Sequence, residues 1–334
     1  MAHHRFAVPR APTGARIVVP SLLVLSILGV PAPSGAQVPP LGLAPVVVTG
    51  NREPTPLDRI VGDIVVIDSE RIRRSSADSV EDLLRREGGI QLSRNGGPGQ
   101  SASVLMRGVG ASGVLVLVDG VRIGSATLGQ VDFAGIGLSQ VERIEILRGP
   151  ASSLYGADAV GGVIQIITRR GSGAPRLTAQ AAVGELHSSK LDAALTGTSD
   201  IFDYAIAIGR EASRGISAVK PDDTFGAFNP DRDGFQRTDL QARGGVTVAP
   251  GHRLGAAYVA NRLRSQYDGT EFLPPSFAPD SSGDLRNRLD TDVATLDYRG
   301  ELTKQWTTTV RVSTQSDDLV SGCLLYTSPS PRDS

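Results

Sequence analysis

The second half of the chain alternates bulky apolar residues with small or polar ones, and this period of two limits it to β-structure. In residues 202–209, for instance, each bulky apolar side chain is followed by a small or acidic one. Successive side chains of a strand point to opposite faces, so each such segment predicts a strand with one apolar face. The pattern occurs in seven segments, at about residues 177–183, 191–195, 202–208, 240–248, 254–260, 294–298 and 306–312.

The connections between these predicted strands are alternately short and long. Short ones lie near residues 198–200, 249–251 and 300–304, and long ones cover residues 210–237 and 262–290. This arrangement is typical of outer-membrane barrels, which have short periplasmic turns and long extracellular loops, and it favours such a barrel over a soluble sandwich. Seven strands would leave two bare edges, which lipid does not tolerate. Residues 173–320 are therefore predicted to be the first strands of a transmembrane antiparallel β-barrel of about 22 strands.

The N-terminus has the three-part pattern of a secretory signal peptide. Three arginines occur in the first 16 residues without any acidic residue, an apolar run follows at residues 17–30, and small residues at 34–36 fit a cleavage site. The apolar run is shorter than the about 20 residues that a membrane-spanning helix needs. Residues 1–36 are therefore predicted to direct export and to be removed, and a retained membrane anchor is the alternative.

The composition argues against several kinds of protein. A formal net charge of −1 removes the basic excess expected of a nucleic-acid-binding domain, so no nucleic-acid partner is predicted. One cysteine and four scattered histidines are too few for a zinc cluster or a Cys-His nucleophile. The sequence contains neither a Gly-x-Ser-x-Gly nucleophile elbow nor a Walker loop. We therefore predict no catalytic residues, no enzyme activity and no covalently bound cofactor.

Residues 57–172 are predicted to form a compact α/β unit rich in glycine turns. A helix is expected to begin at Asp78, with Glu81 at the reciprocal capping position, and to end at the Gly88-Gly89 pair. Asp119-Gly120 between two apolar runs predicts a hairpin with a type I′ turn. Strands are expected at residues 60–67, 114–119, 121–123, 141–148 and 163–168.

Two features of this unit resemble functional motifs but have a simpler interpretation. Residues 108–113 match the Gly-x-Gly-x-x-Gly dinucleotide fingerprint, yet they lead into a strand and not into the helix that the fingerprint requires. A tight turn between strands is therefore predicted. Glu142 and Glu145 could form an acid–base pair, but on a strand we expect them to point to opposite faces as part of a solvated, charged strand.

Residues 321–334 (SGCLLYTSPSPRDS) differ from the strands before them. They break the alternation, contain the only cysteine of the chain and end in proline-rich polar residues. The segment resembles translated read-through at the end of an assembled sequence, so it is predicted to be a non-native tail. A genuine loop is the alternative.

Three groups of short sequences carry a resemblance to a known family. The first is residues 45–52 (PVVVTGNR); the second is residues 147–150 (LRGP), 154–156 (LYG) and 159–168 (AVGGVIQIIT); the third is residues 95–100 (NGGPGQ), 106–108 (MRG) and 114–122 (VLVLVDGVR). Together they resemble the TonB-dependent outer-membrane receptors. The first group looks like the Ton box, the second like the plug signature, and the third is similar to the cobalamin receptors in particular. The chain departs from that group where Ala44-Pro45 stands in place of a polar Asp-Thr pair.

The resemblance implies how such a chain works. A plug domain at residues 57–172 would fill the lumen of the barrel in the bacterial outer membrane. A leader at residues 37–56 would present its Ton box, residues 45–50, to periplasmic TonB. The residues expected to carry this contact are Val46, Val47, Val48 and Thr49. They lie between Pro/Gly-rich stretches, so we predict that they are free to add as a strand to the edge of TonB's sheet.

The resemblance also implies a ligand. It makes the chain part of a transport receptor for a bulky nutrient, with cobalamin or another corrinoid as the substrate. Substrate contacts are expected in two apical plug loops, at Asn95, Gln100, Ser101 and Ala102 and at Ser125 and Gln130. An iron–siderophore complex, which is a metal chelate, is the alternative substrate. A secreted β-rich hydrolase or carbohydrate-binding protein is the alternative outside the family.

Acidic residues crowd the two long loops of the predicted barrel. They are Asp222, Asp223, Asp231 and Asp233 in one loop and Asp268 in the next. Clustered carboxylates suit a hard cation such as calcium, which takes six to eight oxygen ligands. By resemblance, the cobalamin receptors order such loops with calcium. We therefore expect a calcium site there, and a solvated acidic loop is the alternative.

Two plug arginines, Arg107 and Arg148, end predicted strands. Arginines that face a barrel lumen can pair with carboxylates of its wall, and Asp203 and Asp239 are predicted to point inward. We therefore expect Arg148 to help to dock the plug against the barrel.

Overall fold

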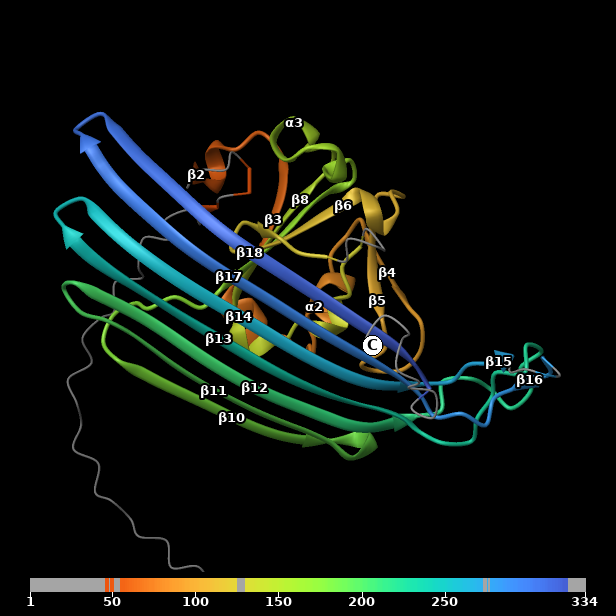
Figure 1. Cartoon of the computed structure of the whole chain (residues 1–334). Coiled ribbons are helices and arrows are strands. Elements are labelled where there is room, and N and C mark those ends of the chain that lie inside the picture. The colour runs from red at the N-terminus through yellow and green to blue at the C-terminus, as the bar shows by residue number, and fades with distance from the viewer. Residues whose placement is uncertain are drawn as a thin grey trace, which may run out of the picture. The chain divides into compact units, whose positions relative to one another are not determined.

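A computed structural model describes residues 46–47, 49–50, 55–124, 130–272, 275 and 277–323 of the 334-residue chain (Figure 1). The chain divides into two units, residues 1–43 and 44–334, and every described residue belongs to the second. The signal peptide predicted at residues 1–36 lies outside the described residues. None of the described helices has the length and apolar character needed to cross a bilayer.

A five-stranded mixed sheet lies at the centre of the α/β unit (Figure 1). Its strands are ordered β3 (Asp63–Ile67), β8 (Val141–Arg148), β9 (Gly162–Thr168), β6 (Val114–Val118) and β7 (Val121–Arg122). Strands β6 and β9 pair in parallel, and the other neighbours pair antiparallel. Separate two-stranded sheets pair β4 (Ile90–Arg94) with β5 (Ala102–Met106) and β1 (Val46–Val47) with β2 (Thr55–Pro56). The predicted α/β unit is confirmed, with β8 at the expected residues.

Short helices connect these strands. The α-helices of the described residues are α1 (Ser69–Arg74), α2 (Val80–Arg85) and α3 (Ser152–Tyr155). The 3-10 helices are η1 (Leu57–Arg59), η2 (Ala111–Gly113), η3 (Phe133–Gly135), η4 (Leu138–Gln140), η5 (Ala157–Ala159) and η6 (Glu185–His187). Leu84 of α2 and Phe133 of η3 are buried in one cluster with Ile144 and Ile146 of β8. The apolar face of α2 therefore packs on the sheet, as its spacing predicts.

The start of α2 differs from the prediction. Ser79, and not Asp78, caps the helix, because its Oγ accepts a hydrogen bond from the amide of Asp82 at 3.3 Å. The Ser79 hydroxyl also donates to Glu81 Oε2 at 2.8 Å. Glu81 therefore bonds the cap side chain and does not complete the reciprocal capping box.

Both predicted turns of the α/β unit are confirmed. Asp119 and Gly120 have φ angles of 49° and 84°, the left-handed conformation that a type I′ turn requires at both central positions. Residues 108–113 end in η2, which leads at once into β6 and not into a helix of the kind that binds a pyrophosphate. The glycine pattern therefore serves a tight turn.

The chain after residue 175 forms a seven-stranded antiparallel sheet, ordered as in the sequence (Figure 1). Its strands are β10 (Arg176–Gly184), β11 (Ser188–Thr198), β12 (Phe202–Ile216), β13 (Asp233–Ala249), β14 (His252–Tyr267), β17 (Leu285–Thr303) and β18 (Trp306–Cys323). A hairpin of β15 (Glu271–Phe272) and β16 (Pro279–Asp280) lies between β14 and β17. The seven predicted strands are confirmed. The sheet is not closed, since β10 and β18 do not pair with each other.

The strands are longer than the alternation predicts, and the long connections are correspondingly shorter. Arg210 pairs with Thr238, and Arg262 pairs with Asp290, at positions that were expected to lie in loops. The apolar alternation stops at these charged residues, but the backbone pairing of the strands continues past them. The long connections are therefore residues 217–232 and 268–284.

The predicted tail at residues 321–334 begins too early. Strand β18 continues to Cys323, which pairs with Leu285, so residues 321–323 belong to the sheet. The remaining residues of the predicted tail lie outside the described part of the chain.

The two faces of this sheet differ in chemistry. The even-numbered residues of β12, β13, β14, β17 and β18 share one face, as the pairing of Ile206, Ala242, Tyr258, Ala294 and Thr314 across the strands shows. We call it the outer face, and it carries the exposed side chains Ile206, Ile208, Leu240, Val246, Leu254, Leu296, Val310 and Val312. The opposite, inner face carries the buried polar side chains Arg237, Asp239, Gln241, Asn261 and Thr295. Apolar outside and polar inside is the pattern of a barrel wall in a membrane.

Candidate functional site

The segment predicted to be a Ton box lies against the α/β unit. Val47 is fully buried and pairs with Thr55 of β2. The amide and the hydroxyl of Thr49 both donate to Glu145 Oε2, at 3.0 and 2.7 Å, and the Tyr155 hydroxyl donates to the carbonyl of Thr49 at 3.0 Å. Val48 lies outside the described residues. The expectation that residues 46–49 are free is therefore wrong for this structure, because burial and hydrogen bonds hold Val47 and Thr49 in place.

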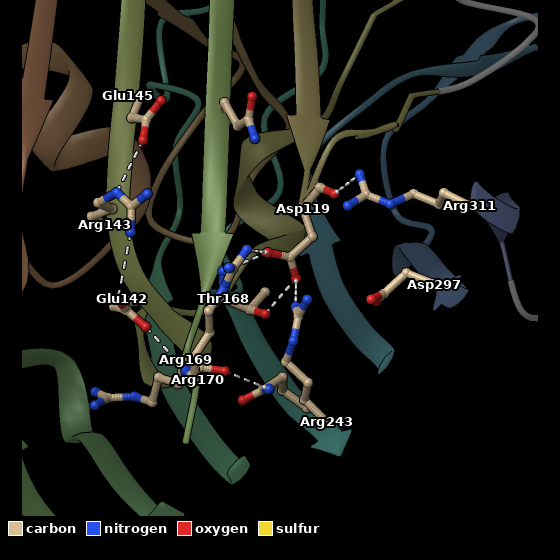
Figure 2. Close-up of polar contacts among 12 residues, drawn as sticks. Asp119, Glu142, Arg143, Glu145, Thr168, Arg169, Arg170, Arg243, Asp297 and Arg311 are labelled. Carbon is tan, nitrogen blue, oxygen red and sulfur yellow. Dashed lines mark hydrogen bonds and ion pairs between the residues drawn. The ribbon is translucent and has the colours of Figure 1, made fainter. Parts of the chain in front are cut away.

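Glu145 is the residue that receives this segment, and it is not the solvated side chain that was predicted. It is fully buried in β8, between β3 and β9. The guanidinium of Arg143 donates to its other oxygen at 3.0 Å, and Figure 2 shows this ion pair beside Glu142. A buried carboxylate is costly unless it is paired and hydrogen-bonded, and Arg143 and Thr49 meet that requirement.

Substitution of Thr49 by valine is expected to weaken the docking of this segment. Valine keeps the shape but removes the hydroxyl donor, so Glu145 Oε2 loses a charge-assisted bond worth about 1.5–3 kcal/mol. The amide of Thr49 should then exchange with solvent about tenfold faster or more in hydrogen-exchange measurements on a complete receptor. Thr178→Val is the control, because the Thr178 hydroxyl binds a carbonyl of the seven-stranded sheet. Unchanged exchange at Thr49 would contradict the role given to Glu145.

A second group of polar contacts joins the α/β unit to the inner face of the sheet around Asp119 (Figure 2). The Asp119 carboxylate accepts hydrogen bonds from the amide and hydroxyl of Thr168, at 3.2 and 2.5 Å, and from Arg243 Nη1 of β13 at 3.0 Å. Its backbone carbonyl accepts from Arg311 Nη1 of β18 at 2.9 Å. Asp119 is 7% exposed. One turn residue therefore connects β9 with two strands of the sheet.

Further contacts between these parts come from η3, η4 and the end of β9. Gln140 donates to Asn261 at 2.8 Å, Gln241 donates to the carbonyl of Arg169 at 3.1 Å, and Arg237 donates to the carbonyl of Ala134 at 3.1 Å. The backbone comes close to β13 at Gly137, where an added Cβ would collide with the Asp239 carboxylate. The polar inner face is thus matched by polar groups of the α/β unit.

A charged cavity of about 420 Å³ lies between α2 and strands β10–β13. Glu81 and Arg94 from the α/β unit line it together with Lys190, Glu211 and Arg237 from the sheet. Burial raises the pKa of Glu81, although its ion pair with Arg94 at 3.1 Å acts in the opposite direction. This polar interior contrasts with the apolar contacts that join α2 to β8.

Arg107 and Arg148 do not pair with Asp203 or Asp239 of the seven-stranded sheet, although this was predicted. Arg107 and Arg148 both pair with Asp63 of β3, Arg148 at 2.6 Å, and Arg148 also donates to the carbonyl of Gly88. Asp203 Oδ1 pairs instead with Arg253 Nη2 at 2.7 Å, and Asp239 Oδ2 lies 3.6 Å from Arg237 Nε. Asp203 and Asp239 thus pair with arginines of their own sheet. Arg107 and Arg148 share Asp63 and do not dock the α/β unit against the seven-stranded sheet.

The residues expected to contact substrate are not equally accessible. Asn95 is exposed and Ser101 and Gln130 are half-buried. Gln100 is buried and donates to the carbonyl of Gln266 in β14, and Ala102 is buried with its amide bonded to Asp132 Oδ1 at 3.0 Å. Ser125 lies outside the described residues. Asn95 and Ser101 therefore remain the accessible candidates of the first loop, whereas Gln100 and Ala102 fix its position.

Three of the five acidic residues assigned to a calcium site come together. Carboxylate oxygens of Asp231, Asp233 and Asp268 lie within 4.8 Å of one another. Asp233 is buried at the start of β13. Asp222 and Asp223 are not part of this group, and Asp223 accepts a hydrogen bond from the amide of Ala227 at 2.9 Å.

Hydrogen bonds from residues 217–219 hold the carboxylates of Asp233 and Asp268 in position. Asp268 accepts hydrogen bonds from the Ser217 hydroxyl and the Val219 amide at 3.1 and 3.3 Å, which joins the two long connections. Asp233 accepts from the amide of Ala218 at 3.0 Å, and Asp231 Oδ1 is buried without a hydrogen-bond partner among the described residues. The oxygens of this group are the type and charge that a calcium ion binds.

Comparisons with known proteins agree with this geometry. Residues 56–163 match the TonB-dependent Receptor Plug Domain. The vitamin B12 transporter BtuB of Photobacterium profundum is 36% identical over 230 residues, and that of Vibrio cholerae is 40% identical over 192 residues, which are 69% and 57% of this chain. The chain spans 37% and 31% of the lengths of these relatives.

Solved structures resemble the fold. The siderophore receptor PirA of Acinetobacter baumannii has a TM-score of 0.60 at 21% identity, over 75% of this chain and 39% of that one. The outer-membrane ferripyoverdine receptor of Pseudomonas aeruginosa has a TM-score of 0.66 at 11% identity, over 86% of this chain and 38% of that one. Residues 56–163 are therefore the plug domain of a TonB-dependent receptor, and the chain is related in sequence to the vitamin B12 transporters and in fold to the siderophore receptors.

Proposed function

We propose that this chain belongs to a TonB-dependent transporter of the bacterial outer membrane that takes up a bulky nutrient, with a corrinoid as its substrate. The observation that carries the proposal is a plug domain bonded to the polar inner face of a sheet whose outer face is apolar. A soluble sandwich would bury its apolar face against a second sheet, whereas a membrane barrel turns it toward lipid. The relatives are transporters and receptors, and no catalytic group enters the proposal.

Different parts of the plug would bind the substrate and TonB. Asn95 and Ser101 lie on the loop between β4 and β5, while Val47 and Thr49 lie beside β8. Substrate would bind on the loop side, and TonB would pair with residues 46–49 after they leave Glu145. An added strand is held by backbone hydrogen bonds, which an extended segment of three consecutive valines can offer. The plug would then move and admit the substrate without any covalent step.

The choice of a corrinoid over an iron–siderophore complex rests on sequence. The vitamin B12 transporters are 36–40% identical, whereas the siderophore receptors PirA and the ferripyoverdine receptor are 11–21% identical and support the fold alone. The test is binding of cyanocobalamin to a complete receptor that carries this segment, with a ferric catecholate as competitor. Saturable cobalamin binding that the ferric chelate does not displace is expected. If the receptor bound only the ferric chelate, the corrinoid assignment would be overturned, whereas the proposed function as a transport receptor would stand.

We propose that the carboxylates of Asp231, Asp233 and Asp268 bind a calcium ion. Asp233→Asn removes a buried negative charge from this group, so without calcium the two long connections should become more resistant to protease. With calcium the variant should gain no further protection, whereas the unmodified receptor should gain it. Asp222→Asn is the matched control, because Asp222 lies outside the group. Equal protection of both variants by calcium would contradict the site.

A further inference from the structure

Asn95 is the first residue after β4 and stands directly before Gly96. Both residues are exposed in the loop that joins β4 to β5. Among the described residues, neither the side-chain amide of Asn95 nor the backbone N–H of Gly96 takes part in a hydrogen bond. A side-chain amide and a backbone nitrogen that can react with it are therefore adjacent and open to water.

The loop requires glycine at position 96. Gly96 has a φ of 152°, which residues with a side chain rarely adopt, and an added Cβ would lie 2.8 Å from Cγ of Gln100. Gln100 is itself held by its hydrogen bond to the carbonyl of Gln266 in β14. The fold of the loop thus places a residue without a side chain after Asn95. A glycine leaves the backbone nitrogen that follows an asparagine unshielded and lets the chain bend toward the side chain.

The other asparagines of the chain lack this combination. Asn229 is followed by Pro230, and proline has no N–H. Asn261 is buried in β14, and Asn287 belongs to β17. The side-chain oxygens of these two residues accept hydrogen bonds at 2.8 and 2.6 Å. Asn51 lies outside the described residues.

We propose that Asn95 is a site of deamidation, in which its side-chain amide is lost through attack by the backbone nitrogen of Gly96. A bond forms between that nitrogen and Cγ of Asn95, the bond from Cγ to the side-chain nitrogen breaks, and ammonia leaves with the proton of the Gly96 N–H. Water then opens the cyclic imide at either carbonyl. The products are aspartate and isoaspartate, in which the backbone runs through the former side chain. The reaction needs water and no other reagent.

Deamidation changes the loop that we assign to the substrate, so its consequence rests on the proposed function. The amide of Asn95 donates to the carbonyl of Ser101 at 3.1 Å, and Gly99 packs against the ring of Phe235. Isoaspartate adds a carbon to the backbone of this loop, which is held at both ends, so its residues must shift. Aspartate replaces a side chain that donates and accepts by one that only accepts. Both products should weaken the binding of a corrinoid.

The first test follows the asparagines by peptide mass spectrometry in a complete receptor that carries this segment, kept at mildly alkaline pH. Asn95 should convert to the acid about tenfold faster or more than Asn229 and Asn287, and labelling by isoaspartyl methyltransferase should identify isoaspartate. Asn95→Gln should prevent conversion at this position on the same time scale, because the longer side chain has to close a larger ring. Equal rates at Asn95 and Asn287 would overturn the proposal.

The second test measures binding of labelled cyanocobalamin to the same samples. Binding should fall as the fraction of converted Asn95 rises, whereas the Asn95→Gln receptor should bind equally before and after incubation. Cyanocobalamin present during incubation should slow conversion at Asn95 and not at Asn287. Full binding by a fully converted receptor would overturn the effect on the substrate loop. If the fresh receptor binds no cyanocobalamin, the proposed function fails instead, and the mass measurement still decides whether Asn95 deamidates.

Discussion

A complete receptor with Val47→Pro is expected to bind cobalamin at the cell surface and to take none of it up. Proline removes the amide donor and fixes φ near about −65°, which a strand paired on TonB does not tolerate. Uptake should fall to the level of cells without TonB. Substrate binding should remain, because Asn95 and Ser101 lie on a different loop of the plug. The measurement is a pair of assays with labelled cobalamin, one at low temperature for binding and one with energised cells for uptake.

Val47→Ala is the control for this result. Alanine can still donate and accept the backbone hydrogen bonds of an added strand. It also buries less surface in the docked position of Val47, which favours release, so its uptake should stay close to normal. Normal accumulation of cobalamin by Val47→Pro cells would show that residues 46–49 are not the coupling strand.

Loss of the Asp119 carboxylate is expected to have the largest effect on the plug itself. In Asp119→Ala the buried guanidinium of Arg243 loses its partner, and Thr168 loses the acceptor of two hydrogen bonds. Removal of one member of a buried ion pair costs about 3–5 kcal/mol. Hydrogen exchange of β6, β7 and β9 should therefore be about 100-fold faster or more in the variant receptor.

Asp158→Ala provides the comparison. Asp158 pairs with Arg122 of β7, so it lies near the same hairpin, but both side chains are about half exposed. An exposed pair contributes about 0–1 kcal/mol, and exchange in this variant should change little. Equal effects of the two substitutions would contradict the special position of Asp119.

Local sequence predicts the parts of this molecule that local interactions determine. The Asp119-Gly120 turn, β8 and the seven strands of the sheet follow from turn residues and from a period of two. The ends of the strands do not, because Arg210 and Arg262 continue the pairing where the apolar pattern stops. Alternation reports which face a side chain takes and not where the backbone hydrogen bonds end.

The polar contacts of the candidate site could not be predicted in the same way. Thr49 and Glu145 are 96 residues apart, and Asp119 and Arg243 are 124 residues apart. Asp119 was recognised as a turn residue, which its φ angle confirms, but nothing in the sequence near it indicates two arginines from another sheet. For the acidic group, three of five residues were predicted correctly as neighbours, since the two long connections meet at Ser217 and Asp268.

The position of Glu145 has a mechanical consequence. A pulling force applied to residues 46–47 acts on the pairing of β1 with β2 and on Thr49, and the bonds from Thr49 end on a strand that lies between β3 and β9. Part of the tension would therefore enter the plug through β8, in its interior. Hydrogen bonds give way over a short extension, so the first displacement would be small and abrupt. Water could then reach a carboxylate that had been sealed inside the domain.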